Sequence, residues 1–165
     1  MVRIKRILAI IMLFILISSL QGVIMANASQ QPLSESENLS IQALNNDRRQ
    51  HCLNPLKPNI TLAEVARRHA IDMMERDYFA HKSPEGIDPF QRIKKAGIRY
   101  KAAGENIYKG LYDPIGEDIY IAQQFLMTSP NHRRNILDSD FTEIGIGIVR
   151  SEDGWMYLVQ CFIKP

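Results

Sequence analysis

The sequence lacks several features that would narrow its function at once. It has only two cysteines and no C-x-x-C pair, so a cysteine-ligated metal site is unsupported. It has no G-x-S-x-G sequence, which removes the nucleophile elbow of many hydrolases. After the first 20 residues no apolar run is long enough to cross a membrane, and no internal repeat is visible. One ordinary globular domain is the simplest expectation.

The first 28 residues predict a cleavable signal peptide. Three basic residues among the first six precede an apolar run at residues 7–20, and Ala26-Asn27-Ala28 has the small-x-small pattern of a cleavage site. The mature chain would then begin at Ser29. The alternative is an uncleaved anchor, but polar residues interrupt the run before it reaches the roughly 20 residues that a span prefers. We therefore expect a secreted, periplasmic or otherwise extracytoplasmic protein, which meets a membrane only through this segment if it stays uncleaved.

Removal of this leader changes the charge of the chain. It takes away three of the 20 basic residues and none of the 18 acidic ones, so the formal net charge falls from +2 to about −1. Such a balance gives no electrostatic footprint for nucleic acid. We expect residues 29–37 to be a flexible lead-in and residues 38–165 to be one domain, which is long enough to bury a core.

Cys52 and Cys161 both lie in the predicted mature part. In an exported protein, an even pair favours one disulfide, which would close a loop of about a hundred residues and add a few kcal/mol of stability. The alternative is two free thiols, because cysteine is also a common core residue. Export favours the Cys52–Cys161 bond.

The first two thirds of the mature chain predict helices. Thr61 and Glu64 form a capping-box pattern, and aspartate followed by proline marks two further starts. Gly97 is a typical helix stop. The expected helices cover Asn38–Gln50, Leu62–Arg76 and Asp88–Gly97, with a fourth starting at Asp113-Pro114 and placing Ile115, Ile119, Ala122 and Leu126 on one face.

After Asn135 the pattern becomes alternating and predicts strands. The segments Thr142–Val149 and Trp155–Ile163, joined by a turn, indicate an antiparallel hairpin. Gly145 and Gly147 share one strand face, which would let a helix or a cleft approach closely. Helices followed by strands favour an α+β layered domain.

Three polar motifs lie between these predicted elements. They are H-x-S-P-x-G at residues 81–86, G-E-N-I at 104–107 and S-P-x-H-R-x-N-I-L at 129–137, and an I-G-I-G strand follows at 144–147. Each of the three places a titratable side chain beside turn-forming residues. Loops of this kind often display functional groups on a scaffold.

In order and spacing, these motifs resemble the CAP superfamily of cysteine-rich secretory proteins, insect venom antigens and pathogenesis-related plant proteins, and its bacterial SCP-like extracellular branch most closely. The resemblance extends from about Leu39 to Phe162. It implies a three-layer α-β-α sandwich in which His81, Glu105 and His132 line one central cleft.

The sequence departs from the eukaryotic pattern of two histidines and two glutamates. Phe125 and Thr128 stand where that pattern has tryptophan and the second glutamate, and Asp140 stands before Thr142 where it has the later histidine. The full tetrad is therefore not carried over. His132 would occupy similar space from a different point in the chain.

The three cleft candidates suggest two kinds of site. His81 and His132, with Glu105 nearby, could hold a divalent cation such as Zn²⁺; the equal alternative is a hydrogen-bonded polar cluster that fixes the loops. Glu105 could also act as a general base beside a histidine acid. Ser83 and Ser129 each precede proline, and turn formation is the expected role of both.

These observations lead to one principal hypothesis. It is an exported, non-enzymatic binding module whose ligand is a lipid, an envelope component or a surface partner, as the resemblance implies. The alternative is a metal-assisted hydrolase acting on peptides or cell-envelope polymers. A structural or adhesion domain with a merely polar core is the third possibility.

Overall fold

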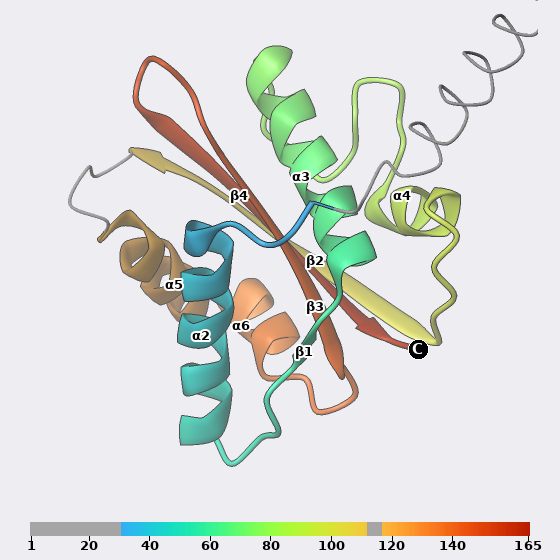
Figure 1. Cartoon of the computed structure of the whole chain (residues 1–165), viewed down its shortest axis with the longest axis vertical. Coiled ribbons are helices and arrows are strands. Elements are labelled where there is room, and N and C mark those ends of the chain that lie inside the picture. The colour runs from blue at the N-terminus through green and yellow to red at the C-terminus, as the bar shows by residue number, and fades with distance from the viewer. Residues whose placement is uncertain (1–30, 112–116) are drawn as a thin grey trace, which may run out of the picture. The chain divides into compact units, whose positions relative to one another are not determined.

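A computed structural model of the chain describes residues 31–111 and 117–165 (Figure 1). Gln31–Pro165 forms one compact unit. The predicted signal peptide, its cleavage site and Ser29 lie outside the described residues. None of the helices that are described has the length and apolar character needed to cross a membrane.

The elements form one sheet with helices on both of its faces (Figure 1). The strands, in the order β1-β3-β4-β2, are β1 Lys57–Pro58, β3 Glu143–Arg150, β4 Trp155–Lys164 and β2 Ala102–Leu111. The helices are α2 Glu35–Gln50, α3 Ile60–Glu75, α4 Pro89–Lys95, α5 Asp118–Thr128 and α6 Pro130–Ile136. β3 and β4 form the predicted antiparallel hairpin, and β1 adds to β3 in parallel.

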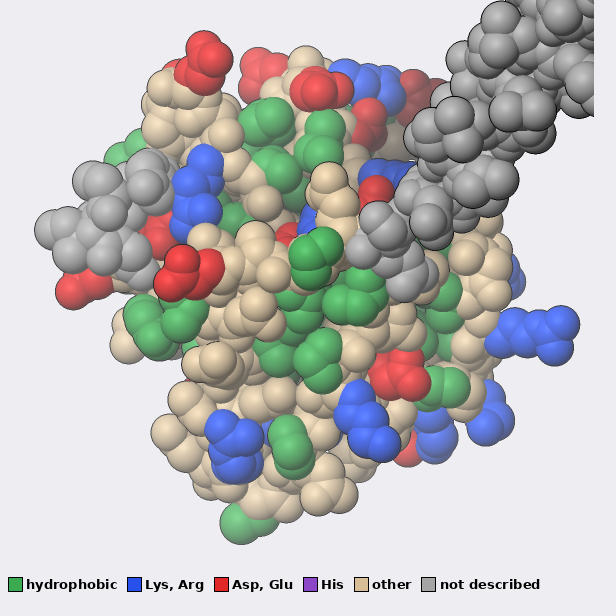
Figure 2. Space-filling view, in the orientation of Figure 1, with side chains coloured by type: hydrophobic (Ala, Val, Ile, Leu, Met, Phe, Trp, Pro, Cys, Tyr) green, Lys and Arg blue, Asp and Glu red, His purple; other side chains and the backbone are tan. Residues whose placement is uncertain are grey.

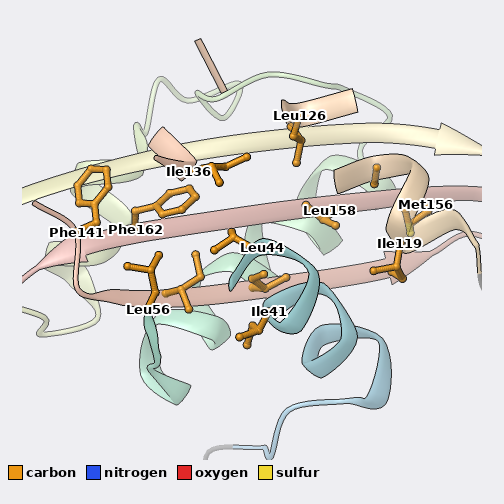
Figure 3. Close-up of a cluster of buried hydrophobic side chains, with 13 residues drawn as sticks. Ile41, Leu44, Leu56, Ile119, Leu126, Ile136, Phe141, Met156, Leu158 and Phe162 are labelled. Carbon is orange, nitrogen blue, oxygen red and sulfur yellow. The ribbon is translucent and has the colours of Figure 1, made fainter. Parts of the chain in front are cut away.

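Two apolar clusters, one on each face of the sheet, define the layers. The first, shown in Figure 3, joins α2, α5 and α6 to the sheet and stacks Phe141 on Phe162 with ring centroids 5.5 Å apart. The second joins α3 and Ile93 of α4 to the opposite face. The α+β class and the three-layer α-β-α sandwich are therefore confirmed.

Gly145 and Gly147 of β3 bring helix α3 against the sheet, as their shared strand face predicted. A Cβ atom on Gly145 would lie 2.3 Å from the backbone of Leu62 and Ala63, and one on Gly147 would lie 2.2 Å from the backbone nitrogen of Arg67. No side chain fits at either position without moving the helix. This close contact fixes α3, and with it the chain that leads to His81.

Helix α2 begins earlier than the sequence predicted. Ser34 caps it, since its hydroxyl accepts from the Glu37 backbone while the Glu37 carboxylate accepts from the Ser34 backbone. Residues 35–37, expected in a flexible lead-in, are therefore the first turn of the helix. The prediction that the helix begins at Asn38 overlooked this capping box.

Helix α3 begins at Ile60, not at Leu62. The Asn59 side-chain oxygen accepts from the Leu62 backbone at 2.9 Å, so asparagine provides the cap that we assigned to Thr61. Glu64, the supposed capping-box partner, pairs instead with Arg68 at 3.0 Å. The helix was predicted correctly but its cap was not.

The later helices agree better with their predictions. Asp88 and Gln91 form a capping box at the start of α4, and Gly97, with φ +77°, follows its end. The predicted start at Asp113-Pro114 and the residue Ile115 lie outside the described residues. The inward face of α5 is confirmed at Ile119, Ala122 and Leu126, which are all buried.

The predicted disulfide is wrong. Both cysteines are free: Cys52 is exposed and Cys161 is buried. Cys161 packs in the cluster under α3, whereas Cys52 follows α2 on the other side of the sheet. The sheet separates the two sulfur atoms, so spacing along the chain was misleading.

Candidate functional site

The G-E-N-I motif lies in an edge strand and not in the loop that we expected. Glu105 and Asn106 sit in the middle of β2, opposite Cys161 and Gln160 of β4. Successive side chains of a strand point to opposite faces. Glu105 therefore faces the α3/α4 layer and Asn106 faces the α2/α5/α6 layer.

Glu105 is the centre of a buried charged cluster. Its side chain is 2% exposed, and its two oxygens accept from His81 Nδ1 at 2.9 Å and from Arg92 Nη2 at 2.7 Å. Arg92 also donates through Nη1 to the carbonyls of His81 and Ile87, at 3.0 Å each. A single guanidinium from α4 thus neutralises the carboxylate and fixes the loop that carries His81.

Cys161 lies behind this carboxylate, with its Sγ 3.8 Å from Glu105 Oε2. Burial, and then the negative charge of Glu105, raise the pKa of the Cys161 thiol well above its usual value. The thiol stays protonated, and it is fully enclosed. It is a packing residue of the site and not a nucleophile.

Asn106 begins a chain of buried amides on the opposite face. Its Nδ2 donates to Gln160 Oε1 at 3.1 Å, Gln160 donates to Gln123 at 3.1 Å, and Gln123 donates to Asp47 at 2.7 Å. Asn135 of α6 donates to Asn106 Oδ1 at 2.8 Å. The chain connects α2, α5, β4, β2 and α6, so it positions α6 relative to the sheet.

His132 is held by this amide chain. Its carbonyl accepts from Asn106 Nδ2 at 3.1 Å, while its buried ring Nδ1 has no hydrogen-bond partner among the described residues. Burial, and then the nearby His81, lower the pKa of His132. The imidazole is therefore neutral at physiological pH.

Past the edge of β2, the two helical layers meet around a pocket of about 380 Å³. All three sequence-predicted cleft residues line it. The lining consists of His81, Glu105, Ser129, Asn131, His132, Arg134 and Asn135. All seven of these side chains carry polar groups, so the pocket offers hydrogen bonds and little apolar surface.

The remaining histidines and serines have local roles. His69 is buried, and its Nε2 lies 3.0 Å from the Ala80 carbonyl. His51 is exposed at the end of α2. The Ser83 hydroxyl accepts from the Ile87 backbone and shapes the turn after His81, as expected.

Sequence reasoning missed Arg92, Gln123 and Gln160. Gln160 had a detectable signal, because it is a polar residue within a strand that is otherwise apolar. Arg92 had none, since it stands among other basic residues whose side chains are mostly exposed.

The residues of the pocket do not fit a zinc site built on His81 and His132. Within residues 31–111 and 117–165, no group of three or more His, Cys, Asp or Glu side chains is placed to hold a metal ion. The Glu105 oxygens are already taken by Arg92 and His81, and a guanidinium 2.7 Å away opposes a second cation.

Comparison with known proteins gives the family. The model of the cysteine-rich secretory protein family, CAP, matches residues 41–162. The chain therefore belongs to the CAP family. It is 41% identical to protein YkwD of Bacillus subtilis over 123 residues, which is 74% of this chain and 46% of YkwD. It is 33% identical to the membrane protein YlbC of the same organism over 129 residues, which is 78% of this chain and 34% of YlbC. The chain thus spans less than half the length of these relatives.

Solved structures agree with this assignment. An extracellular SCP-domain protein of Bacillus anthracis has 30% identity and a TM-score of 0.65, covering 82% of this chain and 45% of that one. An outer surface protein of Borrelia burgdorferi has a TM-score of 0.72 at 23% identity, covering 81% of this chain and 96% of that one, and shares the fold. The chain is thus a CAP-domain protein, and these two neighbours are described as an extracellular protein and an outer surface protein.

Proposed function

We propose that this protein is an exported, non-enzymatic binding module whose β2-edge pocket holds a hydroxyl- and amide-rich portion of a cell-envelope polymer. The state of Glu105 is the main support, since both of its oxygens are engaged by His81 and Arg92. A carboxylate neutralised in this way orients its partners and is itself not free to act as a general base.

The groups that remain available suit a polar, uncharged ligand. The His81 side chain is 49% exposed, and the Asn131 amide and the Ser129 hydroxyl line the pocket with it. Such groups donate and accept hydrogen bonds to sugar hydroxyls and peptide amides. A lipid tail would find little apolar surface here, so we favour an envelope polymer over a lipid for this pocket.

A covalent hydrolytic mechanism lacks an activated nucleophile. In the part of the chain that the structure describes, no serine or cysteine side chain is hydrogen-bonded to a histidine. Nucleophilic catalysis needs such a pair within hydrogen-bond reach. This counts against covalent hydrolysis, and the poor fit of the pocket to a zinc ion counts against the metal-assisted hydrolase.

Calorimetric titration of the mature protein with soluble peptidoglycan fragments tests the proposal. We expect saturable binding that His81→Ala weakens by about tenfold, the loss of one good hydrogen bond. The matched control is His51→Ala, which should bind like wild type, because His51 is exposed and does not line the pocket. Absence of binding, or equal binding by His81→Ala, would refute the proposal. Mass spectra of the recovered fragments separate binding from cleavage, because a binding module returns them intact.

A further inference from the structure

The chain between Pro89 and Gly104 concentrates positive charge on one part of the surface. It contains five basic residues and no acidic one. Lys94, Lys95 and Arg99 are exposed, and no ion pair of the described residues involves them. Lys and Arg side chains gather along the lower right of Figure 2, beside the segment that runs from α4 to β2. This charge is therefore available to a partner.

Exposed apolar side chains stand next to these cations. Ile93 of α4 is fully buried, whereas Phe90 is 44% exposed and Ile87, just before the helix, is 39% exposed. Residues four apart share a helix face, so Phe90 and Lys94 lie together on the outer side. Together Ile87, Phe90, Lys94, Lys95 and Arg99 form what we call the α4 patch.

A pocket beside the α4 patch is lined by cations. It measures about 270 Å³ between α3 and α4, and its walls are Val65, Arg68, Arg92, Lys95 and Ala96. The Nε of Arg92 is a buried donor for which the described part of the chain provides no acceptor. Arg92 is already paired with Glu105 and Arg68 with Glu64, but Lys95 and the Arg92 Nε still suit an anionic group such as a phosphate.

We propose that the α4 patch docks the protein on an anionic membrane surface, with lipid phosphates between Arg68 and Lys95 and with Phe90 in the interfacial region. Basic side chains near an anionic leaflet attract it, and an exposed aromatic ring gains from the headgroup boundary. A soluble polyanion would use the cations but would leave Phe90 and Ile87 without a role. The docking surface uses the α3/α4 layer and does not depend on what the β2-edge pocket binds.

Vesicle flotation tests this proposal with the chain from Ser29 to Pro165, because Gln31–Pro165 is a complete compact unit. We expect binding to vesicles of phosphatidylglycerol and phosphatidylcholine in equal parts, weaker binding as salt rises, and none to pure phosphatidylcholine. The double variant Lys94→Glu/Lys95→Glu should lower the partition coefficient by about two orders of magnitude.

The matched control is Arg49→Glu/Arg133→Glu, which makes the same charge change at exposed positions of α2 and α6 and should bind much more strongly than the α4 double variant. Equal binding by the two double variants, or equal binding of wild type to neutral vesicles, would overturn the proposal. Phe90→Ser should bind more weakly than wild type. If it binds equally well, the surface is a polyanion site and membrane docking is wrong.

Discussion

The two sides of strand β2 build the same pocket by opposite means. On the α3/α4 side, Glu105 is a buried charge that Arg92 neutralises. On the other side, Asn106 belongs to a chain of neutral amides. A buried ion pair depends on both partners, because losing one leaves an unpaired charge, whereas each amide bond contributes modestly. Removing one partner on the charged side should therefore cost a large part of the folding free energy, whereas removing one amide on the other side should cost a smaller part.

Arg92→Met should give the largest effect, since it leaves the Glu105 carboxylate buried without its cation. We expect a loss of about 3 to 5 kcal/mol in the free energy of unfolding, measured by urea denaturation. Arg92→Met/Glu105→Gln should recover much of this loss. If Arg92→Met is as stable as wild type, the Arg92–Glu105 ion pair does not stabilise the fold.

Gly147→Ala tests how firmly the charged side is fixed through α3. The added methyl would meet the helix backbone, which cannot move aside, so we expect a loss of about 3 kcal/mol. Gly104→Ala is the matched change toward the amide side. Its methyl would approach the side chains of Asn135 and Phe141 at 3.1 Å, and these can shift, so about 1 kcal/mol should be lost. Equal losses in urea titrations would contradict this difference.

Gln160→Met interrupts the amide chain in its middle. It leaves Asn106 Nδ2 with one acceptor fewer and Gln123 Oε1 without its donor, so we expect a loss of about 1 to 3 kcal/mol by thermal or urea unfolding. Gln124→Met, an exposed position of α5, should change stability by less than about 0.5 kcal/mol. A loss as large as that of Arg92→Met would remove the contrast between the two sides.

His132 should affect the free energy of unfolding less than the residues above, and its contribution should depend on pH. Its pKa in the folded chain lies below the usual 6.5, so below about pH 6.5 the unfolded chain binds a proton that the folded chain refuses. Stability should fall as the pH is lowered through this window, down to the folded pKa. The buried His69 acts in the same direction, because burial lowers its pKa too.

The measurement for His132 is the melting temperature between about pH 7.5 and pH 5. His132→Gln should show a shallower decline than wild type, and the exposed His51→Gln should decline as wild type does. Parallel curves for wild type and His132→Gln would show that the burial of this imidazole has no energetic consequence.

Local signals predicted most of the fold. Asp88 followed by proline predicted the start of α4. The alternation from residue 142 to residue 149 predicted β3, and the apolar segment after the turn predicted β4 as its antiparallel partner. Gly145 and Gly147 even indicated the close helix contact. Each of these features is determined by residues close together in the sequence, so one sequence is enough to predict it.

What depends on distant partners was not predictable in the same way. Glu105 and Asn106 look like loop residues because they are polar, and distant partners such as Arg92 and Gln160 make their burial in a strand possible. The disulfide failed for the same reason, since nothing near Cys52 or Cys161 reveals that the sheet lies between them. The family resemblance brought the three cleft residues together, but it did not supply the charges and amides that hold them.

The placement of Glu105 and Asn106 as consecutive residues of β2 also protects the site against misassembly. A slip of β2 by a single residue along β4 would exchange the two side chains between faces. The carboxylate would then meet the amides and leave Arg92 alone, while Asn106 would meet a guanidinium that it cannot neutralise. The pocket therefore forms only when β2 pairs with β4 in the correct register. An insertion or deletion within the strand should abolish both together.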